Sequence, residues 1–143
     1  MQEGYEQLKL ANQLCFPLYA AGRKIVSSYT PYLKPLGITY TQYIVFMVLW
    51  EEDGIRVSDL CRRLYLDNGT VTPLLKKMEA EGYIDRVRES RDERVVTVRL
   101  TEKGRALKEA ARDIPEAIGS CVQLSQEEAG QLYGLLYKVL ETL

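Results

Sequence analysis

A change of hydrophobic period in the middle of the chain constrains the fold more than any other feature. Apolar side chains recur every three or four residues up to Gly82, as in amphipathic helices. Two β-branched segments follow, YIDRVRE and VVTVRL, on either side of the polar residues 90–93. This pattern predicts helices that lead directly into a β-hairpin. We therefore expect a mainly α-helical protein with a small β-hairpin wing, of the α+β class.

The N-terminal part of the chain is predicted to form one long helix. Apolar and small residues recur at helical spacing from about residue 6 to residue 29. Pro17 lies inside this segment and removes one backbone donor, so we expect a kink or a displaced turn near Cys15. Residues 31–37 contain two prolines and a glycine, which predict a loop.

Three shorter helices are predicted before the hairpin. Thr39 and Gln42 match a capping box and start the first of them. The next covers Val57–Leu64, and the third ends at the stop signal Gly82. Pro73 belongs to this third helix, and we expect it in the first turn, where a missing N–H has no intrahelical partner.

The C-terminal part is predicted to be helical again. One helix starts at Thr101 and is interrupted near Pro115, and a capping box of Ser125 and Glu128 starts the last one. Its apolar side chains step by three and four residues, and they are Leu132, Leu135, Leu136, Val139, Leu140 and Leu143. Such a stripe at a chain end must pack on something, and a partner subunit is a natural candidate.

Length and composition exclude several classes of protein. A chain of 143 residues has the size of one compact domain. It contains no uninterrupted apolar run of about 18 residues and its N-terminus lacks a signal peptide, so we expect a cytoplasmic protein without a membrane partner. With no His and three Cys, the usual zinc sites and Ser-His-Asp or Cys-His centres lack their parts. We expect no metal, no cofactor and no enzyme activity.

Two short helices, a tight polar turn and an arginine-rich ribbon form the layout of a winged helix-turn-helix. The second helix of such a unit enters the DNA major groove, and the ribbon reaches the flanking minor groove. Arg94 is the candidate for minor-groove insertion, oriented by Asp92 through a charge-assisted hydrogen bond. The predicted DNA-contacting residues are Asn68, Thr70, Thr72, Lys76 and Lys77 on the helix, and Arg86, Arg88, Arg91, Asp92 and Arg94 in the wing.

The charge distribution supports this prediction only weakly. Residues 56–99 hold 10 basic and 8 acidic side chains and are the only positive third of a chain whose net charge is -1. A plainer interpretation also fits, in which Lys76 and Lys77 form a solvated helix face. In that interpretation the wing arginines simply pair with the acidic residues between them.

The block from Gly37 to Gly104 resembles the MarR family of dimeric winged-helix repressors. The resemblance lies in LYLDNGTVTPLLKKMEAEGYIDR and in the wing motif SRDERVVTVRLTEKG. It implies a single MarR-type domain over residues 1–143, with a DNA-binding lobe at 38–100. Residues 5–36 and 101–143 would form the helical dimerisation region of a homodimer that binds a pseudo-palindromic operator.

The resemblance is more specific at the N-terminus. NQLCFPLYAAGR and ITYTQYIVFMVLWEEDG, with the spacing between them, resemble the OhrR branch of organic hydroperoxide-sensing repressors. In that branch a cysteine of the first helix is the peroxide-reactive thiol, and two tyrosine hydroxyls hydrogen-bond to it across the dimer interface. The resemblance assigns these roles to Cys15, Tyr29 and Tyr40, with Tyr19 as a neighbour. Pro17, two residues after the cysteine, departs from the pattern of the branch.

The chemistry of such a sensor is accessible to these residues. A thiolate attacks the O–O bond, and phenolic O–H groups can stabilise that anion without a histidine. In some members a second cysteine near the C-terminus makes a reversible disulfide with the oxidised sensor, whereas others use a small-molecule thiol. The sequence leaves open whether Cys121 is this second cysteine or whether a small-molecule thiol takes its place. Cys61 shares an apolar stripe with Leu60 and is expected in the core.

Three other functions compete with a peroxide-sensing repressor. A MarR-type repressor could respond to a phenolic or drug-like ligand, with Cys15 silent. A thiol peroxidase would use Cys15 as its catalytic group, but it would not explain the charged winged-helix block, and Arg23 lies two turns away from the cysteine. A purely structural domain leaves the arginine-bearing wing unexplained.

Overall fold

The computed structural model of the chain describes residues 4–143 and confirms the mainly helical fold with a small antiparallel sheet. Two 3₁₀ turns, η1 (Glu6–Leu8) and η2 (Leu10–Asn12), open the described chain. The next elements are α1 (Cys15–Ser28), α2 (Thr30–Leu33), η3 (Lys34–Leu36), α3 (Tyr40–Glu51), β1 (Ile55–Arg56), α4 (Val57–Leu64) and α5 (Asn68–Ala80). The remaining ones are β2 (Ile84–Arg88), β3 (Val96–Leu100), α6 (Glu102–Ala110), α7 (Ile114–Cys121) and α8 (Gln126–Thr142).

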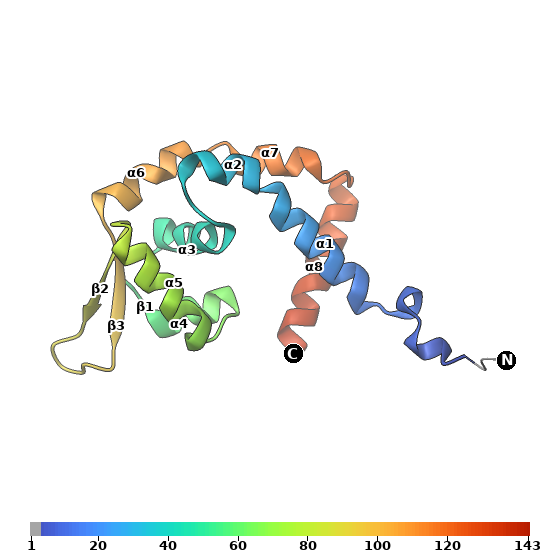
Figure 1. Cartoon of the computed structure of the whole chain (residues 1–143), viewed down its shortest axis with the longest axis horizontal. Helices are drawn as coiled ribbons and strands as arrows, with labels where there is room; N and C mark the ends of the chain where they lie inside the picture. Colours follow the sequence, from blue (N-terminus) through green and yellow to red (C-terminus); the bar gives the residue numbers. More distant parts are fainter. Residues whose placement is uncertain (1–3) are drawn as a thin grey trace.

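The elements are arranged as an arch (Figure 1). Helices α2, α6 and α7 run along its top, and α3, α4, α5 and the sheet form one side, which we call the central lobe. Helices α1 and α8 run down the other side, away from the central lobe. The chain thus has one packed side and one side made of two helices alone.

The sheet has the strand order β1-β3-β2, and all its pairs are antiparallel. Strands β2 and β3 form the predicted hairpin, with Ile84 opposite Leu100 and Arg88 opposite Val96. The short strand β1 pairs with the other edge of β3, with Ile55 opposite Val98. Because β1 ends where α4 begins, the wing is joined to the helix-turn-helix from both sides.

The core lies in the central lobe around α3. Phe46, Leu49 and Tyr43 of this helix are buried against α4, α5 and the sheet. Leu60 of α4 and Leu75 of α5 are buried in the same cluster. Burial of several large apolar side chains, each stabilising by about 1.5–3 kcal/mol, fixes the angle between α4, α5 and the wing.

Local helix signals in the sequence are confirmed. Thr39 and Gln42 form both hydrogen bonds of a capping box at the start of α3, and Ser125 and Glu128 do the same for α8. Thr101 accepts a hydrogen bond from the Gly104 N–H and so caps α6. These caps define the start of each helix because they satisfy backbone N–H groups that have no partner within the helix.

Three expectations about helix limits are wrong. The predicted helix from residue 6 to 29 begins only at Cys15, after two 3₁₀ turns, so that Pro17 falls in the first turn of α1, where its missing N–H costs little. Residues 31–37 form α2 and η3 rather than an irregular loop, closed by Gly37 at φ 71°. Pro73 lies beyond the first turn of α5, because the cap at Asp67 starts this helix at Asn68.

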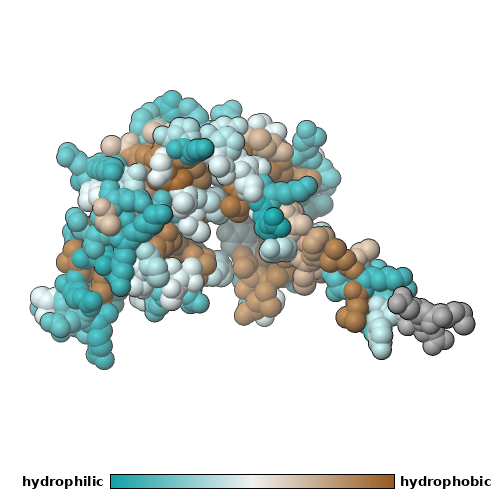
Figure 2. Space-filling view, in the orientation of Figure 1, coloured by the Kyte–Doolittle hydropathy of each residue, from teal (hydrophilic) through white to brown (hydrophobic). Residues whose placement is uncertain are grey.

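The side of the arch made by α1 and α8 is exposed. In the structure of residues 4–143, neither helix contains a buried residue. Figure 2 shows apolar surface gathered over the free ends of these two helices. Leu14, Leu18 and Leu135 are 85%, 46% and 61% exposed. Large apolar side chains in this number on two helices indicate a surface that another protein chain covers. None of the described helices is long and apolar enough to cross a membrane.

Candidate functional site

The start of α5 and the wing face each other across a groove of about 440 Å³. Its lining includes Arg56, Asn68, Thr72, Arg88 and Arg94. The structure therefore brings residues of the predicted DNA-binding set together from two elements that are separate in sequence. Arg56 was missed by sequence reasoning, and its only signal was a basic residue directly before a helix.

The N-terminus of α5 is held by Asp67. One oxygen of this carboxylate accepts a hydrogen bond of 2.7 Å from the Thr70 N–H. The side-chain and backbone hydrogen bonds from Thr70 lower the pKa of Asp67. Thr70 itself is exposed, and Lys76 and Lys77 are exposed further along the helix. These side chains are free to meet a polyanion.

The wing tip contains a preorganised arginine. Arg94 donates hydrogen bonds to Asp92 from Nε at 3.1 Å and from Nη2 at 3.3 Å, while the Arg94 side chain is 91% exposed. These bonds lower the pKa of Asp92. Arg88 donates to the Glu93 carbonyl at 2.8 Å, and Arg91 is exposed at the tip. The contact predicted between Asp92 and Arg94 is therefore present, on the strongly hydrophilic wing of Figure 2.

Arg86 has a different environment from the other wing arginines. Its backbone N–H and its Nη2 donate to the two carboxylate oxygens of Glu79 on α5, at 2.8 and 3.1 Å. The hydrogen bonds from Arg86 lower the pKa of Glu79. Arg86 thus fastens β2 to α5, and only part of its guanidinium faces the groove.

Tyr29 and Tyr40 lie side by side although they are eleven positions apart in the sequence. Their ring centroids are 4.9 Å apart, and Tyr43 completes a cluster at 5.6 Å from Tyr29. Burial raises the pKa of all three phenols, and for Tyr29 and Tyr43 the neighbouring tyrosines add to this effect. The hydroxyls are therefore protonated donors at neutral pH. No role was assigned to Tyr43 from the sequence.

Cys15 lies far from this cluster within its own chain. It is the first residue of α1, and Tyr29 directly follows the last. Fourteen helical residues span about 21 Å, so one chain cannot bring the thiol to its own Tyr29. Cys15 is exposed, and Tyr19, one turn on, stacks under the Arg23 guanidinium at 5.6 Å. The residues of the predicted sensor can meet only between two chains.

The other two cysteines differ in accessibility. Cys121 ends α7 and is exposed, with its thiol donating to the Ala117 carbonyl at 3.4 Å. Cys61 is buried, as expected, and its thiol donates to Asn68 Oδ1 at 3.3 Å. All three cysteines are free thiols. Cys15 and Cys121 are therefore both accessible in a single chain.

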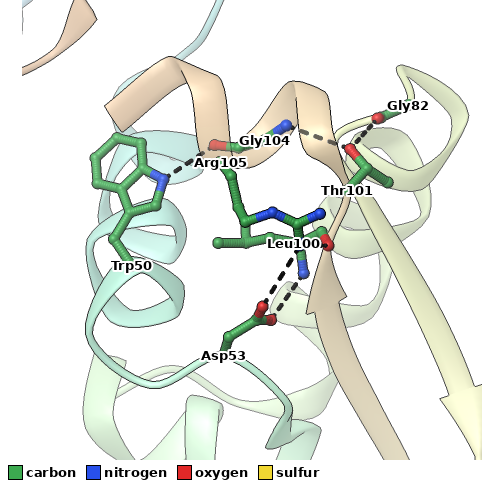
Figure 3. A network of polar contacts seen from close by, with 7 residues as sticks. All are labelled: Trp50, Asp53, Gly82, Leu100, Thr101, Gly104 and Arg105. Carbon is green, nitrogen blue, oxygen red and sulfur yellow. Dashed lines mark hydrogen bonds and ion pairs between the residues drawn. The ribbon is translucent and has the colours of Figure 1, made fainter. Parts of the chain in front are cut away.

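A polar junction joins the wing to α6 (Figure 3). Trp50 Nε1 donates to the Gly104 carbonyl at 3.0 Å, and Arg105 donates to the Leu100 carbonyl at 2.9 Å. Asp53 accepts from the Leu100 N–H at 2.8 Å and faces Arg105 at 3.9 Å. This junction links α3, β3 and α6, and so ties the central lobe to the helices that follow it. Sequence reasoning missed it because its partners are up to 54 residues apart.

Comparisons with known proteins agree with this arrangement. Residues 27–111 match the family of transcriptional regulators SarA/Rot. The organic hydroperoxide resistance transcriptional regulator of Bacillus subtilis is 47% identical over 143 residues, which cover 100% of this chain and 97% of that protein.

Solved structures of AbfR, a protein of Staphylococcus epidermidis, are 38% identical over 96% of this chain. Reduced AbfR bound to DNA superposes with a TM-score of 0.79, overoxidized AbfR bound to DNA with 0.78, and disulfide-formed AbfR with 0.68. These alignments cover 95%, 96% and 93% of the AbfR chains. With these relatives, its winged helix and its helical flanks, the chain belongs to the MarR family of winged-helix transcriptional regulators, in the branch of the organic hydroperoxide resistance regulators.

Proposed function

We propose that this protein is a dimeric DNA-binding repressor that releases its operator when an organic hydroperoxide oxidises Cys15. The observation that carries the proposal is the paired cluster of Tyr29 and Tyr40, with ring centroids 4.9 Å apart, at a distance that Cys15 of the same chain cannot bridge. A second copy placed on the exposed faces of α1 and α8 would bring a thiol to each tyrosine pair.

Residues 38–100 form the proposed DNA-binding lobe, and residues 5–36 and 101–143 the proposed dimerisation region. Asn68, Thr70 and Thr72 at the start of α5 would enter the major groove, and Lys76 and Lys77 would neutralise phosphates. In the wing, Arg88, Arg91 and Arg94 would reach the flanking minor groove, with Arg86 holding the wing to α5. A two-fold dimer requires a pseudo-palindromic operator with half-sites about 34 Å apart.

The sensor chemistry follows from the residues around the thiol. The Cys15 thiolate attacks the O–O bond of a hydroperoxide, so that the sulfur becomes a sulfenic acid and the leaving alkoxide takes a proton to become an alcohol. Protonated phenols of Tyr29 and Tyr40 stabilise the thiolate by donating hydrogen bonds. The thiol is consumed once per signal, and in this proposal it is a sensor and not a turnover catalyst.

A disulfide is the proposed second step. The sulfenic acid condenses with another thiol, which forms the S–S bond and releases water. Either Cys121 of the partner subunit or a small-molecule thiol supplies that group. For AbfR, structures on DNA exist for the reduced and the overoxidized protein, and disulfide-formed AbfR superposes less well on this chain than either of them.

The test is fluorescence anisotropy of the reduced full-length protein on labelled DNA from upstream of its own gene. One equivalent of an organic hydroperoxide should release the DNA, and dithiothreitol should restore binding. Cys15→Ser should bind DNA and ignore the peroxide. Cys121→Ser distinguishes the two candidates for the second thiol. It should block the release of DNA by peroxide only if Cys121 of the partner subunit forms the disulfide with Cys15. Peroxide release that persists in Cys15→Ser would sink the sensor assignment and favour a small-molecule inducer.

A further inference from the structure

The buried thiol of Cys61 makes one side-chain hydrogen bond, and its acceptor lies in the groove. Cys61 Sγ on α4 donates to Asn68 Oδ1 on α5 at 3.3 Å. Cys61 is only 8% exposed, whereas Asn68 lines the groove together with Thr72, Arg88 and Arg94. The contact therefore connects a core position with the surface that faces DNA in the proposed function.

The Asn68 side chain is not required to cap its own helix. That task belongs to Asp67, whose carboxylate accepts from the Thr70 N–H. With its oxygen held by Cys61, the Asn68 carboxamide keeps two N–H donors on Nδ2, and these form no hydrogen bond within residues 4–143. A donor fixed in this way at the start of α5 suits acceptor atoms on DNA.

The thiol stays a donor under ordinary conditions. Burial and the nearby Asp67 carboxylate raise the pKa of Cys61, so that the group remains S–H at neutral pH. Burial also separates its chemistry from that of the exposed Cys15 and Cys121, which are the accessible thiols.

We propose that Cys61 is a positioning residue for operator recognition, whose thiol orients the Asn68 carboxamide so that Nδ2 donates to an acceptor atom of the operator. The inference rests on the proposed DNA binding and extends it to a residue that lies in the core. The acceptor is an oxygen or nitrogen of a base edge or a phosphate oxygen. A base edge would make Asn68 contribute to discrimination between sequences, and a phosphate would make it contribute equally on all DNA.

Two substitutions at the same position separate the hydrogen bond from packing. Cys61→Val removes the donor and keeps an apolar side chain that is larger by about one methyl group, whereas Cys61→Ser keeps a donor. The readouts are the Kd of the reduced full-length protein for operator and for unrelated DNA, at one salt concentration, and the thermal midpoint. We expect Cys61→Val to weaken operator binding about fivefold while its thermal midpoint stays well above the temperature of the titration, and Cys61→Ser to restore most of the binding.

Asn68→Ala completes a double-mutant cycle. This variant alone should weaken operator binding about tenfold, and adding Cys61→Val to it should cost nothing more, because the residue through which Cys61 acts is gone. A parallel loss on unrelated DNA would identify a phosphate as the acceptor, and a loss confined to the operator would identify a base edge.

Three outcomes would overturn the inference. Cys61→Val could bind the operator as tightly as the wild type, or Asn68→Ala could leave the Kd unchanged. In the third outcome, Cys61→Val would raise the Kd by the same factor in the wild type and in the Asn68→Ala variant. Failure of the proposed function looks different. A wild type that binds no upstream DNA contradicts both proposals. A wild type that binds DNA but does not release it with peroxide contradicts only the role of Cys15 as a sensor, and the double-mutant cycle of Cys61 and Asn68 still tests the inference.

Discussion

Gly104 lies closer to its surroundings than the other glycines of residues 22–134. A Cβ atom at this position would lie 2.3 Å from the backbone oxygen of Tyr83 and 3.0 Å from a Leu100 methyl group. The first contact is with a backbone atom, which cannot rotate away as a side chain can. The clash could therefore be removed only if α6 moved away from Tyr83. The close approach of Gly104 is therefore what lets the junction of Figure 3 form.

Gly104→Ala should lower the free energy of unfolding by about 1–3 kcal/mol, the range for overpacking a filled site. Urea unfolding at a fixed protein concentration measures it. Gly119→Ala is the matched control, because a Cβ there meets nothing within 4 Å inside α7 and should leave stability unchanged or slightly raised. Equal effects of the two substitutions would contradict the close-contact explanation.

Glu79 links stability to pH. Hydrogen bonds from Arg86 lower the pKa of Glu79 in the folded protein. The ionised carboxylate therefore stabilises the fold fully when the pH is above the pKa of Glu79 in the unfolded chain, which is about 4.3. That contribution is lost as the pH falls through the lowered folded pKa. Glu79→Gln should be less stable than the wild type at pH 7, and the difference should shrink towards pH 3. Guanidinium unfolding at several pH values follows it, and a constant difference would show that the charge of Glu79 plays no part.

Single residues were predictable where the partner is close in sequence. The Asp92 and Arg94 pair spans two residues, and the physical chemistry of a charge-assisted hydrogen bond was sufficient to expect it. The contact of Cys61 with Asn68 was not predictable, because it depends on how α4 and α5 cross. The roles of Cys15, Tyr29 and Tyr40 came from family resemblance, since helical spacing alone places them merely on apolar faces.

At the scale of elements, the function of the wing can be tested by a single substitution at its tip. Its tip extends beyond the sheet, and Arg94 projects from it with its guanidinium held by Asp92. Holding the guanidinium before binding reduces the side-chain entropy lost on contact with DNA.

Arg94→Ala should weaken operator binding about tenfold and reduce the slope of log K against log salt by about one, as expected for one lost phosphate or minor-groove charge. Anisotropy titrations at several salt concentrations measure both quantities. Arg112→Ala is the control, because Arg112 is exposed beyond the end of α6 and pairs with Glu109. If both variants behave like the wild type, the wing does not contact DNA as proposed.

Elements were predictable where a cap or a sharp change of period marks them. The starts of α3, α6 and α8 follow from side chains within three residues of the helix. Strand β1 has only two residues and no period of its own, so only its pairing with β3 defines it. The first helix was overextended because apolar spacing continues before Cys15 without a cap to end the pattern.

At the scale of the whole molecule, the position of Cys15 means that the proposed sensor needs two chains, one for the cysteine and the other for Tyr29 and Tyr40. Mixing subunits tests this. In a heterodimer of a Cys15→Ser chain and a Tyr29→Phe/Tyr40→Phe chain, the only Cys15 faces the intact tyrosines of the other subunit. Its rate of sulfenic acid formation, followed by mass spectrometry of a trapped adduct, should equal that of the wild type. The Tyr29→Phe/Tyr40→Phe homodimer should react more slowly, because it lacks the phenols.

A heterodimer purified through two different tags gives this measurement without contamination by homodimers. A slow reaction in the heterodimer would show that each Cys15 depends on tyrosines of its own chain. The geometry of α1 makes that outcome incompatible with the described fold, because about 21 Å of helix separates the two positions.

The junction of Figure 3 has a mechanical consequence. Because Trp50 and Arg105 fasten the start of α6 to α3 and the wing, α6 and the central lobe move as one stiff lever. The nine residues of α6 span about 13 Å, so a tilt of about 15° at the far end of α6 displaces the lobe by about 3.4 Å, the rise of one base pair. A tilt that reaches α6 from the far side of the arch would therefore move the lobe as a whole, without any rearrangement inside the lobe.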